Sequence, residues 1–137
     1  MAKKLKKGIH KLVEEARADI DEVDPQEALR LQASGEAVIV DIRDVRERAR
    51  EGFIKDSFHC PRGMAEFWVD PDSPYFKPIF GEDKRFLLHC AVDWRSALTV
   101  HTLKQMGMDN VAHIRGGFNA WRDAGCPVTT LDEEKKA

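Results

Sequence analysis

Two short apolar runs constrain this chain more than any other feature. Residues 38–42 and 86–90 are nearly continuous apolar segments with β-branched or aromatic members. Strands of this kind must be covered on both faces, which is typical of a parallel sheet between helices. Residues 58–60 and 111–114 are weaker strand candidates.

Helical patterns alternate with these predicted strands. Asp24, Pro25 and Glu27 stand in the order of a cap, a first-turn proline and a capping glutamate, and Gly35 supplies a stop. We predict helices over residues 9–19, 25–33, 45–51, 64–69, 96–106 and 118–124. The alternation predicts an α/β domain with helices on both sides of a central sheet.

The length of 137 residues fits one globular domain, and 42% hydrophobic content suffices for its core. We expect a basic, amphipathic helical extension over residues 1–21, the domain itself over 22–130, and a charged tail over 131–137. Residues 70–81 combine prolines, a glycine and aromatic side chains, which favours a long ordered loop.

Charge and hydropathy limit the partners that we expect. The formal net charge is −2 and no basic face is apparent, which argues against nucleic acid. Residues 1–7 are rich in lysine, but no apolar run of signal-peptide or membrane-spanning length follows them. We therefore expect a cytoplasmic protein with no membrane partner.

Three cysteines, Cys60, Cys90 and Cys126, form no CxxC pair. An odd, small number of this kind indicates reduced thiols, at least one of which could be reactive. Cys90 ends a predicted buried strand, and a helix follows within a few residues. Because helix N-termini favour anions, this position would stabilise a thiolate, and Arg95 adds a cation there while Asp93 opposes it.

Other polar side chains also follow the predicted strands. Asp41 and Arg43 follow the first strand, Arg62 follows the second, and a glycine pair follows the last. Since ligands of open α/β sheets bind beyond the carboxyl ends of the strands, these groups should gather at one edge.

Three motifs then indicate a family. Cys90-x4-Arg95-Ser96 resembles the active loop of the rhodanese family, Asp41-x-Arg43-Asp44 resembles its upstream motif, and Gly116-Gly117-x-x-x-Trp121 its downstream one. The resemblance covers residues 22–130 and implies a rhodanese-like three-layer domain with a central five-stranded parallel sheet flanked by helices.

The resemblance also implies a sulfurtransferase. Cys90 would be the nucleophile that carries sulfane sulfur as a persulfide, between an anionic donor such as thiosulfate or a persulfide and a thiol, cyanide or protein acceptor. The backbone amides of the loop would cradle the persulfide, Arg95 would support the loop as a cation, and Asp41, Arg43 and Arg62 would support the site. The predicted cradle comprises Ala91, Val92, Asp93, Trp94 and Arg95. No metal or organic cofactor is implied.

The sequence departs from the family pattern at two places. Asp93 stands where family members often have glycine, and residues 52–57 differ from the usual G-H-I-P-G-A stretch. We interpret Asp93 as a residue that supplies left-handed backbone geometry in place of glycine. Trp94 places bulk at the mouth of the site, so thiosulfate could be a poor donor.

Simpler structural interpretations remain open for several residues. Arg95 could form a surface salt bridge, and Asp41 could cap a helix or loop. Cys60 could be a resolving thiol, although a buried strand-end cysteine is the simpler interpretation. His59 and His89 precede cysteines, but strand neighbours face opposite ways, so neither pair should chelate a metal, and His89 should belong to the core.

Two alternative functions also remain open. Cysteine phosphatases and arsenate reductases use Cys and Arg around an anion, although the related phosphatases have a longer loop than the four residues between Cys90 and Arg95. The domain could instead be a persulfide carrier of low turnover or a partner-binding module.

Overall fold

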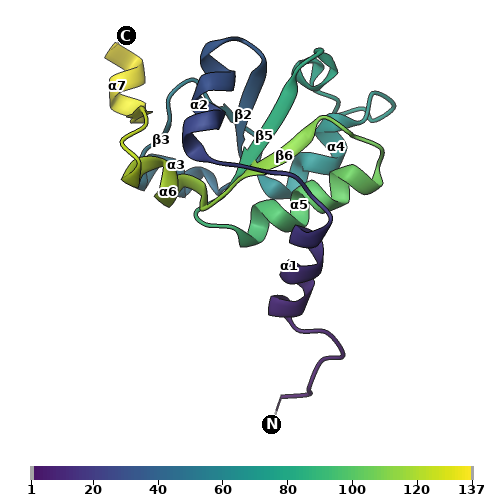
Figure 1. Cartoon of the computed structure of the whole chain (residues 1–137). Coiled ribbons are helices and arrows are strands. Elements are labelled where there is room, and N and C mark those ends of the chain that lie inside the picture. The colour runs from purple at the N-terminus through teal and green to yellow at the C-terminus, as the bar shows by residue number, and fades with distance from the viewer. Residues whose placement is uncertain (1, 137) are drawn as a thin grey trace.

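The computed structural model describes residues 2–136 and has three layers, with helices on both faces of a parallel sheet (Figure 1). The sheet has the order β1-β6-β5-β2-β4, and every neighbouring pair is parallel. Its strands are β1 (Glu22–Val23), β2 (Ala37–Asp41), β4 (Phe58–His59), β5 (Arg85–His89) and β6 (Val111–Ile114). The predicted five-stranded parallel sheet is confirmed, and β1 is a strand that sequence patterns did not indicate.

The six predicted helices all form, with shifts of a few residues at their ends. They are α1 (Ile9–Ala18), α2 (Pro25–Ala33), α3 (Val45–Glu51), α4 (Ala65–Val69), α5 (Trp94–Gln105) and α6 (Gly117–Asp123). A 3-10 turn over Arg62–Met64 precedes α4, and another over Pro78–Gly81 lies in the predicted ordered loop. In the charged C-terminal segment, Leu131–Lys136 forms α7.

Alternate side chains of each central strand enter opposite layers of the core. Ile39 and Leu87 pack with α2 and α6, whereas Val40 and Leu88 pack with α4 and α5. All four side chains are at most 1% exposed. This double burial explains why the two strands appear in the sequence as unbroken apolar runs.

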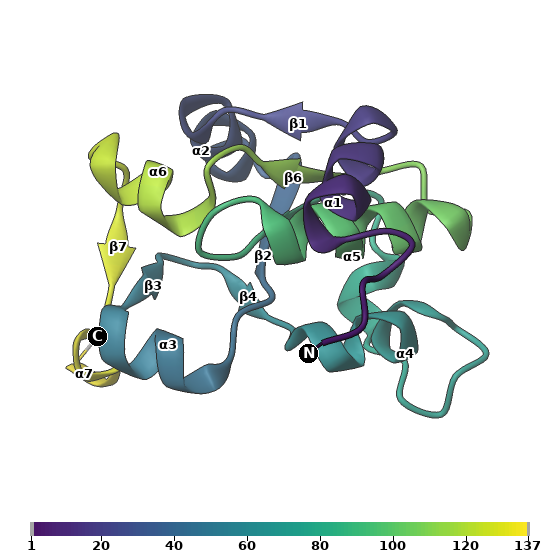
Figure 2. The ribbon, with the colours of Figure 1, turned by 90° about the horizontal axis from the view of Figure 1, so that it is seen from below.

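Two features lie outside the central layers. Val13 and Ala16 of α1 pack on Ala97 of α5, so the N-terminal helix covers α5, as Figures 1 and 2 both show. A small antiparallel sheet pairs β3 (Phe53–Ile54) with β7 (Val128–Thr129). Sequence patterns did not indicate these two-residue strands.

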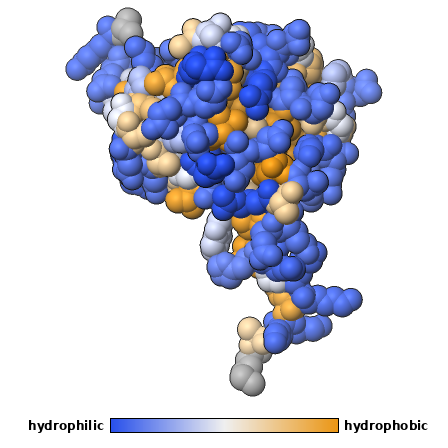
Figure 3. Space-filling view, viewed as in Figure 1, coloured by the Kyte–Doolittle hydropathy of each residue, from blue (hydrophilic) through white to orange (hydrophobic). Residues whose placement is uncertain are grey.

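The surface seen in Figure 3 is mostly hydrophilic, with apolar side chains also present on the projecting N-terminal segment. Leu5, Ile9 and Leu12 are exposed there. Within residues 2–136, none of the helices combines the length and apolarity needed to span a bilayer.

Candidate active site

Cys90 lies directly after β5, at the carboxyl edge of the sheet and shortly before α5. Its side chain is 1% exposed. The backbone amide of Ser96, in the first turn of α5, donates to Cys90 Sγ at 3.4 Å, and Sγ lies 3.5 Å from Ser96 Oγ. The thiol therefore faces the N-terminus of α5, where the helix favours negative charge.

A backbone amide does bind Cys90 Sγ, but it belongs to the residue that follows the predicted cradle. Among the described hydrogen bonds, the amide that reaches Cys90 Sγ belongs to Ser96 rather than to the loop of Ala91 to Arg95. Two loop carbonyls accept from α6, because Phe118 N donates to Cys90 O at 2.8 Å and Asn119 N to Ala91 O at 3.1 Å. The loop is thus held against the start of α6.

Gly117 makes this close approach of loop and helix feasible. A Cβ atom at that position would lie 2.4 Å from Val92 O and 2.5 Å from Cys90 O, and Gly117 also has φ +59°. No other residue type fits this contact without moving the loop. The second glycine of the downstream motif is therefore explained by packing against the active loop.

The backbone interpretation of Asp93 is wrong. Asp93 has φ −126° and ψ −12°, outside the left-handed region, and forms the N-cap residue of α5. Its carboxylate accepts a hydrogen bond from Gly116 N at 2.7 Å and lies 3.7 Å from Arg17 Nη1. Asp93 joins the loop to the segment before α6 through its side chain, and Arg17 compensates part of its charge.

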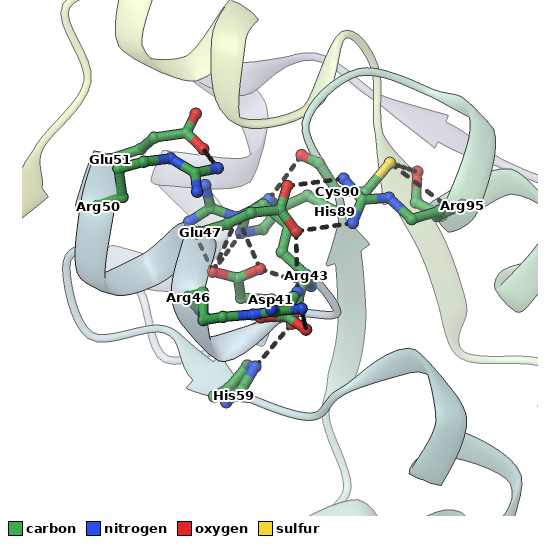
Figure 4. A network of polar contacts seen from close by, with 12 residues as sticks. Asp41, Arg43, Arg46, Glu47, Arg50, Glu51, His59, His89, Cys90 and Arg95 are labelled. Atoms are coloured by element: carbon green, nitrogen blue, oxygen red, sulfur yellow. Dashed lines mark hydrogen bonds and ion pairs between the residues drawn. The ribbon is translucent and has the colours of Figure 1, made fainter.

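Arg95 forms a bidentate pair with Glu47 of α3, with nitrogen to oxygen distances of 2.8 and 3.0 Å (Figure 4). Glu47 also accepts from Asp44 N at 2.9 Å as part of a capping box. The pKa of the Arg95 guanidinium is raised, first by Glu47 and to a lesser extent by the sulfur of Cys90. The cation is thereby fixed beside the loop.

The predicted cations meet in a pocket at this edge. Arg43, Arg62 and Arg95 line a pocket of about 240 Å³ together with Asp44 and residues of the segment before α4. Arg62 is exposed, whereas Arg43 is fully buried. Arg43 is paired with Asp41 and Arg95 with Glu47, so Arg62 is the exposed positive side chain of this pocket, and Asp44 adds a negative one.

Asp41 and Arg43 belong to a buried group, the Asp41 cluster, which comprises Asp41, Arg43, Arg48 and His89. Arg43 binds Asp41 through Nε at 3.0 Å and Nη2 at 2.9 Å, and Arg48 Nη1 lies 3.0 Å from the same carboxylate. Burial would raise the pKa of Asp41, but the charge of a protonated His89 and the hydrogen bonds and charge of Arg43 lower it, so that this pKa lies well below its usual range. Within residues 2–136, the hydrogen bonds of Asp41 and Arg43 do not include Cys90, so neither side chain binds the thiol.

His89 is a core residue of this cluster, in agreement with the alternation of strand side chains. It is fully buried, its Nδ1 lies 3.1 Å from Cys90 O, and its Nε2 lies 3.9 Å from Asp41. Burial lowers the pKa of His89 and thus favours the neutral ring. The hydrogen bond of His89 to Cys90 therefore goes to the backbone and not to the thiol.

A second polar group, missed by the sequence analysis, reaches the thiol itself. This Glu22 cluster comprises Glu22, Arg17, Arg115, His113 and Ser96. Ser96 Oγ lies 2.9 Å from His113 Nδ1, and His113 Nε2 lies 2.6 Å from Glu22 Oε2. Ser96 and His113 are fully buried. A histidine inside the apolar strand segment 111–114 was the available signal, since such a side chain needs buried polar partners.

Glu22 is held as a carboxylate. Arg17 Nε lies 2.8 Å from it and Arg115 Nε 3.4 Å. Burial would raise the pKa of Glu22, but hydrogen bonds from Arg17 and His113 lower it to about 2.

Glu22, His113 and Asp93 place potential metal-binding atoms within 4.8 Å of one another, yet each is already engaged by a cation, a hydroxyl or an amide.

The other two cysteines are buried and free. Burial, with a smaller contribution from Glu66, raises the pKa of Cys60 to about 12. Burial also raises the pKa of Cys126. Cys60 therefore stays a thiol at neutral pH, which agrees with the interpretation of a buried strand-end cysteine.

Trp94 and Val92 lie on the outside of the active loop. Trp94 is 46% exposed and packs edge-on against His10 of α1 at 5.1 Å between ring centroids. Val92 is 44% exposed. Both side chains are therefore open to solvent beside the loop.

Fold and site define a class of protein: an α/β domain with a buried cysteine at a strand end, presented to the N-terminus of a helix. The model of the Rhodanese-like domain family matches residues 24–124. The chain belongs to that family, and its relatives include sulfurtransferases.

Three relatives illustrate the range. The chain is 28% identical to thiosulfate sulfurtransferase GlpE of Actinobacillus pleuropneumoniae over 80% of this chain and 93% of that protein. It is 51% identical to a solved Rhodopseudomonas palustris protein of unknown function, described as a possible tyrosine phosphatase, with a TM-score of 0.88 over 94% of this chain and 99% of that one. A thiosulfate sulfurtransferase from Pseudomonas aeruginosa is 25% identical, with a TM-score of 0.71 over 89% of this chain and 22% of that one.

Proposed function

We propose that this chain is a sulfurtransferase that carries sulfane sulfur as a persulfide on Cys90. The observation that carries the proposal is the contact of Cys90 Sγ with the first-turn amide of α5, at 3.4 Å. A helix N-terminus and the nearby guanidinium of Arg95 both favour an anionic sulfur. The family membership and the relatives named as sulfurtransferases support the same chemistry.

The proposed reaction has two steps, and atoms and electrons balance in each. The Cys90 thiolate attacks the outer sulfur of thiosulfate, a new S–S bond forms, and the old S–S bond breaks with its electron pair leaving on sulfite. An acceptor such as cyanide or a thiolate then attacks the outer sulfur of the persulfide. The carbon–sulfur or sulfur–sulfur bond of the product forms, and the electron pair returns to Cys90.

The pocket lined by Arg43, Arg62 and Arg95 would receive the anionic donor. Arg62 is exposed and Arg95 is clamped by Glu47, so one cation is free to adjust and the other is fixed. The cation of Arg62 would offset part of the repulsion between thiosulfate and a thiolate.

The test is sulfur loading followed by release. Reduced protein is incubated with thiosulfate or with glutathione persulfide, its intact mass is measured, and cyanide is added with an assay for thiocyanate. We expect a gain of one sulfur on Cys90 and its release as thiocyanate. Cys90→Ser should abolish both, and Cys60→Ala is the matched control that should keep both. A protein that loads no sulfur from either donor would refute the proposal.

A tyrosine phosphatase is the second candidate, because the Rhodopseudomonas palustris relative is described as a possible one. The four residues between Cys90 and Arg95 form a smaller ring than the related phosphatases use, which suits one sulfur atom better than a tetrahedral oxyanion. Hydrolysis of p-nitrophenyl phosphate that depends on Cys90 would reverse this ranking.

Turnover separates an enzyme from a persulfide carrier. An enzyme releases many thiocyanate molecules per chain, whereas a carrier forms one persulfide and passes it on slowly. Multiple-turnover kinetics with thiosulfate and cyanide decide between these two forms of the proposal.

A further inference from the structure

A continuous chain of polar contacts links the thiol of Cys90 to Glu22 at the edge of the sheet. Cys90 Sγ lies 3.5 Å from Ser96 Oγ, which lies 2.9 Å from His113 Nδ1, and His113 Nε2 lies 2.6 Å from Glu22 Oε2. Cys90, Ser96 and His113 are each at most 1% exposed. Water therefore has little access to the middle of this chain.

We propose that Ser96, His113 and Glu22 form a proton relay that converts Cys90 to its thiolate, an inference that rests on the proposed function. Ser96 contacts the reacting sulfur, whereas His113 and Glu22 act through it as positioning residues. The relay has an acceptor at its centre, since one ring nitrogen of a neutral imidazole carries a lone pair that can accept a proton.

The hydrogen bonds fix one tautomer for His113. A carboxylate can only accept, so His113 Nε2 carries the proton that is donated to Glu22. His113 Nδ1 then presents a lone pair to the hydroxyl of Ser96. Ser96 Oγ donates to His113 and accepts from the thiol of Cys90.

The proton moves in two concerted transfers. The S–H bond of Cys90 breaks as its proton passes to Ser96 Oγ, and the Ser96 hydroxyl proton passes to His113 Nδ1. The products are a thiolate, an unchanged serine and an imidazolium paired with the Glu22 carboxylate, so protons and charge balance. When the acceptor later frees the thiolate, the same path returns the proton.

The charges around His113 are compatible with this transfer. Glu22 of β1 and Asp93 of the active loop are negative, whereas Arg17 of α1 and Arg115 after β6 are positive and pair with Glu22. The two carboxylates stabilise an imidazolium, and the bonds from Arg17 and His113 keep Glu22 ionised.

The experiment is the pH profile of Cys90 alkylation by iodoacetamide, a neutral probe, with the site located by peptide mass spectrometry. His113→Asn keeps a hydrogen-bond acceptor for Ser96 but cannot take a proton, and Ser96→Ala breaks the relay with both ends intact. We expect the alkylation rate at pH 7 to fall about tenfold or more in each variant, with the midpoint of the profile moving to higher pH. His101→Asn, on the same helix as Ser96, is the control and should match the wild type.

A second measurement guards against misfolding and restricted access. Thiolate absorbance at 240 nm, taken as the difference from Cys90→Ser, should show the same displacement in Glu22→Gln, which alters only a partly exposed side chain. Wild-type profiles in folded Ser96→Ala and Glu22→Gln would overturn the relay. Neither measurement uses a sulfur donor, so a chain that loads no sulfur but shows the displacement would lose the proposed function and keep the relay.

Discussion

Two histidine and carboxylate groups flank the active loop and differ in what they reach. In the Asp41 cluster, the side chain of His89 lies in the core, and its hydrogen bond to Cys90 goes to the backbone carbonyl. In the Glu22 cluster, His113 comes from the next strand of the sheet and reaches the thiol through Ser96. Position along the chain is thus a poor guide to contact with the thiol, because the alternation of strand side chains turns His89 away from the thiol of its neighbour Cys90.

The largest effect should come from the Asp41 cluster. Asp41→Asn would leave Arg43 and Arg48 buried without their counter-charge, and we expect the free energy of unfolding to fall by about 3–5 kcal/mol. Urea unfolding measures it. Asp19→Asn, at a largely exposed carboxylate, is the control. Equal free energies of unfolding for the two variants would show that the buried ion pairs of this cluster stabilise the fold no more than an exposed carboxylate does.

Sulfur loading tests whether the two histidines differ in their effect on Cys90. We expect His113→Asn to load sulfur from thiosulfate about tenfold more slowly at neutral pH, because its thiolate forms less readily. His89→Asn retains an amide that can donate to Cys90 O, so its loading rate should stay within about twofold of the wild type. If the His89 variant loads sulfur more slowly and the His113 variant is unaffected, the Asp41 cluster rather than the Glu22 cluster acts on the thiol.

Acid unfolding tests how much the ion pairs of Glu22 contribute to the stability of the fold. The folded-state pKa of Glu22 is about 2, below the ordinary value of 4.5, so its ion pairs stabilise the fold above the ordinary pKa and are lost as the pH falls toward 2. We expect a loss on the order of 1 kcal/mol between about pH 5 and pH 2 that Glu22→Gln removes. Parallel stability curves for the two proteins over that range would contradict it.

The smallest effect should come from Cys60. Its thiol stays protonated at neutral pH because burial raises its pKa to about 12, so Cys60→Ala should load sulfur within about twofold of the wild type. Mass spectrometry of peroxide-treated protein examines the other possibility directly. A disulfide between Cys60 and Cys90 would establish a resolving thiol and end this interpretation.

The sequence predicted the layers of the fold because burial on both faces leaves a plain signal. The apolar runs of β2 and β5 and the capping patterns of α2 and α3 indicated the central strands and their helices. The two-residue strands β1, β3 and β7 escaped prediction because their segments are too short to show a periodic pattern, whereas the equally short β4 was indicated by the apolar residues Phe58 and Cys60 around it. Their pairing is decided by contacts with segments far away in the chain.

The site was predictable at Cys90 and less so around it. A strand-end cysteine before a helix, followed by Arg95, is a local pattern. The partners of Arg95 and His113 are not local: Glu47 lies 48 residues from Arg95, and Glu22 lies 91 residues from His113. Asp93 misled the interpretation because its side chain, rather than its backbone, connects the loop to Gly116.

Glu47 gives the active loop a dependence on a distant helix. The same carboxylate closes the capping box of α3 and clamps Arg95, so the first turn of α3 and the loop share one anchor. Fraying of that turn would release the guanidinium at the same moment. The amides at the start of α3 and the position of the Arg95 cation should therefore fluctuate together, which makes hydrogen exchange in that helix a reporter of how often the loop opens.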